Sequence, residues 1–152
     1  MSFSKYVDRI ALLSLLTASL GVPAAVACSA ATAQSSHVSA RVPLPGGGET
    51  RFYTTGPAGT TTCRVDLTAA GQVLGAAQVL TDDNFRHINP GMTAQDVLAL
   101  IGPPSSKMRF ERTKTTSWDY HFTDAWSYDS EFSVIVDDRG IVVSKFTERL
   151  GQ

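Results

Sequence analysis

The chain has 152 residues and a formal net charge of −1 at neutral pH. Hydrophobic residues make up 43% of it and charged residues 18%, a composition typical of a globular protein rather than a disordered one. The near-neutral charge argues against a dedicated nucleic-acid-binding protein, which would carry an excess of basic residues. Two cysteines and three histidines without the spacing of a ligand set predict no metal site, and we expect no cofactor.

Residues 1–27 have the pattern of a secretory signal peptide. Lys5 and Arg9 give a basic start, residues 10–20 form a mostly apolar run, and residues 24–27 are small. Basic, apolar and small-residue regions in this order are typical of export signals. The apolar run is too short to cross a hydrocarbon core of about 30 Å. The sequence therefore predicts an exported protein.

The end of this signal can be interpreted in two ways. Residues 25–28, with the sequence AVAC, resemble a bacterial lipobox, in which the cysteine is lipidated and becomes the first residue of the mature protein. On this interpretation Cys28 anchors the chain to a membrane, and residues 28–45 form a flexible tether. In the alternative, cleavage after Ala33 releases a soluble protein that begins at Gln34.

Residues 46–80 are expected to form a β-meander. One strand starts at Arg51, a second covers residues 60–67 and a third covers residues 72–80, with glycine-containing turns between them. Apolar residues alternate along the second strand, which places Cys63 on its buried face. A buried apolar thiol is the expected state of Cys63.

Two short helices are expected next. Residues 81–84 combine N-cap residues and acids, which suit the start of a helix, and Phe85 would lie on its buried face. Thr93, with Asp96 three residues later, resembles a capping box and would begin the second helix. Gly102, followed by two prolines, would end it, because glycine readily adopts the left-handed conformation found after helix ends.

The C-terminal part is expected to form a second meander, with strands over residues 118–122, 132–136 and 141–146. A shift of 69 residues superposes the apolar positions of the two meanders. The sequence therefore predicts an α+β fold: two short helices packed on antiparallel three-stranded meanders, with an extra N-terminal meander. The superposed pairs are Cys63 with Phe132, Val65 with Val134, Leu67 with Val136 and Val73 with Val142.

One pattern extends across both expected helices. It reads I-x-x-G-M-T-x-x-x-V-x-x-x-x-G-x-P, and its fixed positions are Ile88, Gly91, Met92, Thr93, Val97, Gly102 and Pro104. With this pattern the chain resembles the SmpA/OmlA (BamE-like) family of outer-membrane lipoproteins. The resemblance implies that residues 81–152 form a BamE-like domain, with the order helix, helix, strand, strand, strand. It also implies that residues 46–80 are a partial first repeat, the remainder of a degenerate upstream copy.

The resemblance implies a non-enzymatic lipoprotein at the periplasmic face of the outer membrane, anchored through the lipid on Cys28. Its implied partners are envelope proteins, among them components of the β-barrel assembly machine, and its implied role is outer-membrane protein assembly or envelope integrity. The alternative is a secreted or periplasmic inhibitor-like binding module without a lipid anchor, because β-lactamase inhibitor proteins contain related units. Fold alone does not decide between these functions.

The sequence offers candidate contact residues but no catalytic set. The serines lack the motif of a nucleophile elbow, and the paired acids at residues 137–138 lie in an expected hairpin turn. Trp126 and Tyr128 lie in the loop between two expected strands, and exposed Trp and Tyr are typical interface anchors. They are therefore candidate partner contacts, with a role in capping the edge of the core as the alternative. Phe110 is a third candidate contact.

Overall fold

The computed structural model describes Cys28, residues 37–55 and residues 59–151. The predicted signal peptide, residues 1–27, lies outside these described residues. The elements in chain order are β1 (Ala40–Pro43), β2 (Glu49–Thr55), β3 (Thr61–Leu67), β4 (Val73–Gln78), α2 (Asp82–His87), α3 (Ala94–Ile101), β5 (Ser106–Phe110), β6 (Thr115–Thr123), β7 (Asp129–Asp137) and β8 (Val142–Arg149).

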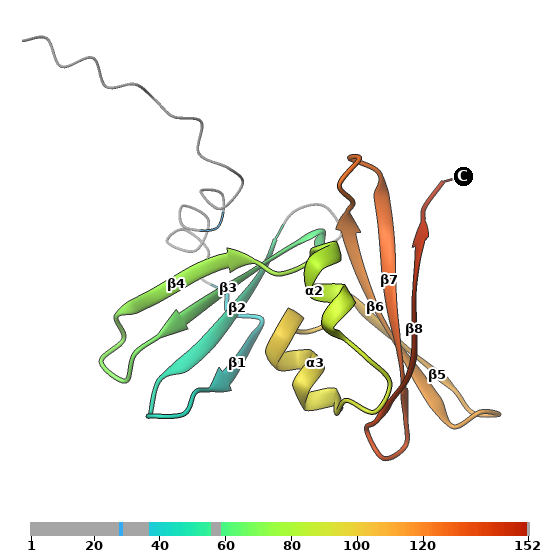
Figure 1. Ribbon diagram of the computed structural model, residues 1–152, viewed down its shortest axis with the longest axis horizontal. Helices are drawn as coiled ribbons and strands as arrows, with labels where there is room; N and C mark the ends of the chain where they lie inside the picture. The colour runs from blue at the N-terminus through green and yellow to red at the C-terminus, as the bar shows by residue number, and fades with distance from the viewer. Residues whose placement is uncertain (1–27, 29–36, 56–58, 152) are drawn as a thin grey trace, which may run out of the picture.

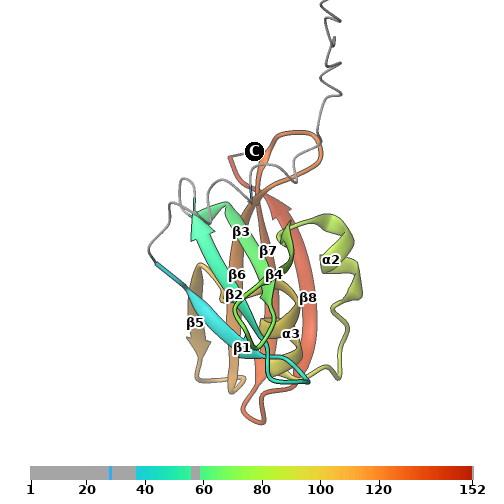
Figure 2. The same cartoon turned by 90° about the vertical axis from the view of Figure 1, so that its left-hand side faces the viewer.

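The strands form two antiparallel sheets with the helices between them (Figure 1). The first sheet has the order β1-β2-β3-β4 and the second the order β5-β6-β7-β8. Figure 2, which looks onto the first sheet, shows its strands in front of those of the second sheet. None of the described helices combines the length and the apolar character needed to cross a membrane. The α+β class predicted from the sequence is confirmed.

Both helices begin where the sequence predicts, and α3 also ends at the predicted residue. The Thr81 hydroxyl oxygen accepts a hydrogen bond from the Asn84 N–H at 3.3 Å, which caps α2. Thr93 and Asp96 form the predicted capping box, because each side chain accepts a hydrogen bond from the other residue's backbone N–H, at 3.1 and 2.9 Å. Gly102 follows α3 with φ of +78°, as predicted.

The main hydrophobic core lies between the helices and the second sheet. The Phe85 ring of α2 stacks on Phe132 of β7, with 4.1 Å between the ring centroids, and meets the Phe122 ring edge-on at 4.8 Å. Tyr120 is fully buried and donates its hydroxyl hydrogen to the Gly102 carbonyl oxygen at 3.1 Å. Burial raises the pKa of this hydroxyl, so that it stays neutral in the folded protein.

The two faces of the first sheet have different neighbours. Phe52 points toward the end of α3, where it meets Gly102. Cys63 and Val65 lie on the opposite face, because successive side chains of a strand alternate, and they pack with Cys28 in a second, smaller core. A disulfide joins Cys28 to Cys63. The expectation of a free buried thiol at Cys63 is therefore wrong.

The hairpins β3–β4 and β7–β8 have the same register after a shift of 69 residues. Leu67 pairs with Val73 in the first hairpin, and Val136 pairs with Val142 in the second. Each hairpin carries a bulge at the equivalent point of its ladder. The turn of each contains a glycine with positive φ at the equivalent position. The shift of 69 residues that superposes the apolar positions in the sequence therefore also superposes the paired residues of the two hairpins.

The structure corrects the predicted strand count, because each sheet has four strands rather than three. Residues 40–43, expected within the flexible tether, form β1 and pair with β2. Residues 106–110 form β5, which the sequence did not predict because all five residues are exposed and no buried face marks the strand. This strand exists because its backbone pairs with β6.

Candidate functional site

Asp124 organises the loop between β6 and β7. Its Oδ1 accepts hydrogen bonds from the backbone N–H groups of Trp126 and Tyr128, both at 2.9 Å. Its own N–H donates to the Tyr128 carbonyl oxygen at 2.9 Å. Aspartate suits this position because its short side chain can accept from backbone groups a few residues further along the chain. The loop therefore presents Trp126 and Tyr128 from a backbone that is fixed by Asp124.

Arg149, at the end of β8, contacts both aromatic rings and Asp124. Its Nε donates to Asp124 Oδ2 at 2.9 Å, and its guanidinium carbon lies 4.5 Å from the Tyr128 ring centroid and 5.1 Å from that of Trp126. These distances are within the range of cation–π attraction. Trp126 is nevertheless 70% exposed and Tyr128 49% exposed. Both rings thus contact Arg149, and neither is buried in the core.

The negative charge of Asp124 is neutralised by groups of the protein itself. Its side chain is only 7% exposed. Burial raises the pKa of the Asp124 carboxyl, but hydrogen bonds from the Tyr128 and Trp126 amides and from Arg149 outweigh this effect, so that the pKa lies below its ordinary value. The carboxylate is therefore charged at neutral pH and balanced by Arg149. We do not expect it to attract a basic partner.

A groove of about 820 Å³ lies beside this loop. Phe85 and Phe132, both almost fully buried, form its floor, and the exposed rings of Trp126 and Phe146 line it near the surface. It is bounded by α2, the loop after β6 and the later part of β8. The remaining lining residues are Gln78, Leu80, Thr81, Asp82, Asp83, Arg86, Thr123, Asp124, Ala125, Lys145 and Thr147.

The two cations that line the groove are bound to groups of the protein itself. Lys145 Nζ donates to the carbonyl oxygens of Phe85 and Arg86, at 2.8 and 3.2 Å, in the last turn of α2. Arg86 forms an ion pair with Asp83. A cation at the C-terminal end of a helix is favoured by the carbonyls that point out there. The chemistry that best fits the groove is therefore an apolar or aromatic side chain.

Phe110 lies on another surface of the molecule. It ends β5, which is the edge of the second sheet opposite to β8. Its side chain is 44% exposed. The structure thus brings Trp126 and Tyr128 together beside the groove and leaves Phe110 apart from them.

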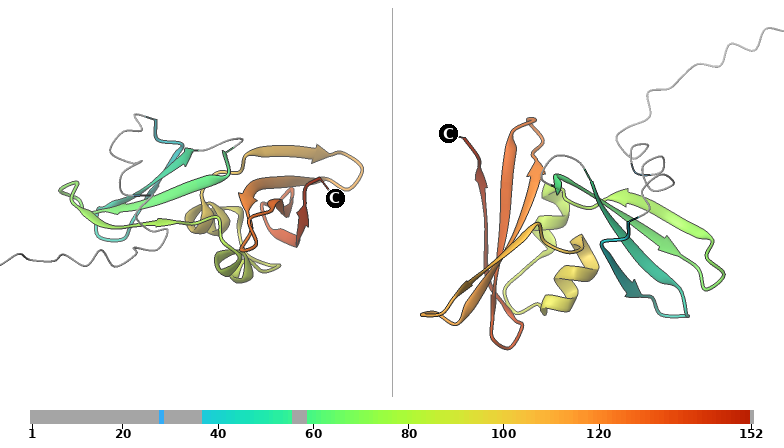
Figure 3. Two further views of the ribbon diagram at one scale, coloured as in Figure 1. Left: turned by 90° about the horizontal axis from the view of Figure 1, so that it is seen from above. Right: turned by 180° about the vertical axis from the view of Figure 1, so that it is seen from behind.

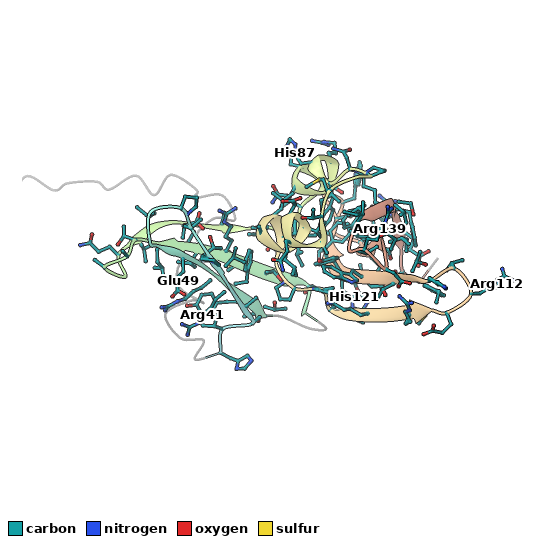
Figure 4. The ribbon with its side chains drawn as sticks, turned by 90° about the horizontal axis from the view of Figure 1, so that it is seen from below. Arg41, Glu49, His87, Arg112, His121 and Arg139 are labelled. Atoms are coloured by element: carbon teal, nitrogen blue, oxygen red, sulfur yellow. A yellow bond between two sulfur atoms is a disulfide. The ribbon has the colours of Figure 1, made fainter. Side chains whose placement is uncertain are left out.

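The histidines do not converge on a common site. His87 lies at the end of α2, and His121 lies on β6 with its Nε2 at 2.7 Å from Glu131 Oε2 on β7 (Figure 4). Within the described part of the chain, no three His, Cys, Asp or Glu residues are grouped so that they could hold a metal ion.

The sequence interpretation missed Arg149, Phe146 and Lys145. Each acts across strands or between a strand and a helix, so that no spacing along the chain connects it to its partner. Arg149 contacts a loop 25 residues earlier, and Lys145 contacts a helix end about 60 residues earlier. The glycine-containing hairpin turn at residues 137–140 was the local signal, and it predicted the return strand rather than its contacts.

Comparison with known protein families gives a match, and it includes the loop and most of the groove. Residues 77–145 match the family model described as outer membrane protein assembly factor BamE domain. The match covers the end of β4, both helices, β5, β6, β7 and the first half of β8, together with Trp126 and Tyr128. Searches of curated proteins and of solved structures found no match.

Proposed function

We propose that this protein is a non-enzymatic accessory factor in outer-membrane protein assembly or envelope integrity, acting at the periplasmic face of the outer membrane by binding other proteins. The observation that carries the proposal is the match of residues 77–145 to the BamE domain. In this proposal the partners are envelope proteins, including components of the β-barrel assembly machine.

The docking surface in this proposal is the groove with Trp126 and Tyr128 at its side. An exposed tryptophan held by Asp124 and Arg149 loses little conformational entropy on binding, which favours its use as an anchor. The apolar floor of the groove suits an apolar side chain of the partner.

Substitution of Trp126 tests this surface. Trp126→Ala should weaken capture of purified β-barrel assembly components roughly 30-fold, the effect of losing about 2 kcal/mol at an interface hot spot. Phe110→Ala is the matched comparison, because it removes another exposed aromatic ring, at the far edge of the second sheet. If only Phe110→Ala lost capture, the partner contact would lie at β5 instead of beside the groove. Unchanged capture in both variants would contradict the proposed docking surface.

The anchor in this proposal is a lipid on Cys28. Attachment of a lipid to the Cys28 sulfur and a disulfide to Cys63 use the same atom, so each excludes the other. The disulfide of the structure therefore favours a second candidate function, a periplasmic or secreted binding module without a lipid anchor. In that case the same groove would act from solution.

Labelling with palmitate and intact-mass measurement distinguish the two candidates. A lipoprotein incorporates the label and leaves Cys63 as a reactive thiol. An unanchored module incorporates no label, contains both cysteines in the mature chain and has no reactive thiol. A mature chain that begins at Gln34 would be an unanchored module that lacks Cys28, so it would contradict both the lipid anchor and the disulfide.

We also propose that residues 46–80 are a partial first repeat. The shared register of β3–β4 and β7–β8 supports this. In this alignment Cys63 corresponds to Phe132. The disulfide from Cys28 to Cys63 in the first repeat therefore corresponds to the stacking of Phe85 on Phe132 in the second. The disulfide would thus replace an aromatic contact between helix and sheet.

A further inference from the structure

The two sheets have four edge strands, and these differ in how they discourage strand pairing. β1 carries Arg41 and Pro43, and β5 carries Lys107 and Arg109. β8 carries a lysine, a glutamate and an arginine. Charged residues and proline on an edge strand are the usual protection against pairing with another chain. β4 has neither, because residues 67–81 contain no charged residue and no proline.

The edge of β4 is also open to solvent. β4 is one of the two edge strands of the first sheet, and its start lies far from the second sheet (Figure 3). Val73 and Leu74 are 66% and 65% exposed, and Ala77 is exposed as well. A bulge next to Val73 ends the regular ladder there. The regular part of the edge therefore runs from Gly75 to Gln78.

The backbone of this segment is oriented for pairing. The Val79 N–H donates to the Thr62 carbonyl oxygen at 2.9 Å, so Val79 faces β3. Backbone groups of an antiparallel strand alternate between its two neighbours, which directs the N–H and C=O groups of Ala76 and Gln78 away from β3. These groups form the ladder edge that another strand would use.

We propose that β4 pairs antiparallel with β4 of a second copy of this chain, joining two first sheets into one continuous sheet. Two-fold pairing sets each strand against its own reversed sequence, so an edge whose charges all have one sign would meet like charges. β4 is neutral and avoids this repulsion, whereas pairing through β5 would bring Lys107 and Arg109 against the same residues of the other copy. Small residues at the centre, Gly75, Ala76 and Ala77, allow the two strands to approach.

Light scattering of the purified full chain over a wide range of concentration tests the proposal. The expected result is a mass that rises from one copy to two. Ala77→Lys places a charge on the edge at an exposed position and should keep the protein monomeric at concentrations where the wild type is dimeric. Ala77→Thr, which is neutral and suits a strand, is the matched control and should dimerise as the wild type does.

Hydrogen exchange of the wild-type protein is a second test, which does not depend on whether Ala77→Lys folds. In the wild-type dimer the amides of Ala76 and Gln78 should exchange more slowly than in the dilute monomer, while amides on the outer edge of β8 should not change. A protein that is monomeric at every concentration overturns the proposal. So does a dimer that Ala77→Lys leaves intact, a dimer without protection at β4, or protection at β4 that requires a strand from a different protein.

Discussion

Arg149 and Asp124 lie 25 residues apart in the chain and are joined by a hydrogen bond of 2.9 Å from Nε to Oδ2. The ion pair connects the end of β8 to the loop that carries Trp126 and Tyr128. The order of the exposed aromatic rings therefore depends on a charge pair at their base.

Acidification should release this loop. The pKa of Asp124 is lower in the folded protein than its ordinary value of 3.8, so its contribution to stability is complete above pH 3.8 and is lost as the pH falls through the lower folded value. We expect quenching of Trp126 fluorescence by acrylamide to rise in that acid range. Trp118 is buried and should contribute little to the change.

Asp124→Asn is the matched control for this titration. The amide oxygen can still accept from the Trp126 and Tyr128 N–H groups, but it has no charge to hold Arg149. The variant should show increased quenching already at neutral pH and no further acid step. A wild-type acid step that persists unchanged in Asp124→Asn would assign it to another carboxyl.

Gly102 should be intolerant of any side chain for two separable reasons. Its φ of +78° disfavours residues other than glycine, and a Cβ built there would lie 2.8 Å from Cδ1 of Phe52. Gly140→Ala is the matched control, because Gly140 has φ of +77° but its nearest atom would be 3.9 Å away. Urea unfolding should show a cost of about 1–2 kcal/mol for Gly140→Ala and roughly 1–3 kcal/mol more for Gly102→Ala. Equal costs would contradict the close contact with Phe52.

The disulfide should make the two cysteines equivalent in their effect on stability. Cys28→Ala, Cys63→Ala and the double variant should each lose about 3–4 kcal/mol of unfolding free energy, the amount expected for a loop closed over a separation of 35 residues. Chemical denaturation with and without a reducing agent measures this, and the reducing agent should affect only the wild type. A loss of membrane association in Cys28→Ala, with no effect of Cys63→Ala, would instead indicate a lipid on Cys28.

Lys145 should stabilise the end of α2. Lys145→Met keeps the apolar stem but removes the hydrogen bonds to the Phe85 and Arg86 carbonyls, so we expect a cost of about 1.5–3 kcal/mol and faster amide exchange in α2. Lys107→Met makes the same change on β5, where the amine lies 4.0 Å from the Trp118 ring centroid. It should cost about 0.5–1 kcal/mol and leave exchange in α2 unchanged. Equal effects of both variants on α2 would contradict the role given to Lys145.

The parts of the fold that local rules determine could be predicted from the sequence. The capping box at Thr93 and the glycine at the end of α3 act within a few residues, and their residue types identify them. β6 and β7 alternate apolar and polar residues because one face packs into the main hydrophobic core. β1 and β5 could not be found in this way, since edge strands are defined by their neighbour rather than by burial.

The candidate site was predictable only in its most exposed residues. Trp126 and Tyr128 are conspicuous because large aromatic side chains are unusual in a short loop. The structure shows their neighbour Asp124 as the acceptor that closes the loop, a role that its place in the sequence does not reveal. Arg149 became part of the site only through the pairing of β8 with β7. Sequence spacing cannot show contacts that depend on such register.

The position of β1 limits how far the folded body could stand from a membrane. If a lipid is attached to Cys28, only the chain between Cys28 and Ala40 separates the bilayer from the first sheet, and even fully extended it would reach roughly 40 Å. A tether extending to residue 45 would have reached further. The groove beside Trp126 would then work within one molecular length of the bilayer, where the partners it can meet are those that are themselves held at the membrane.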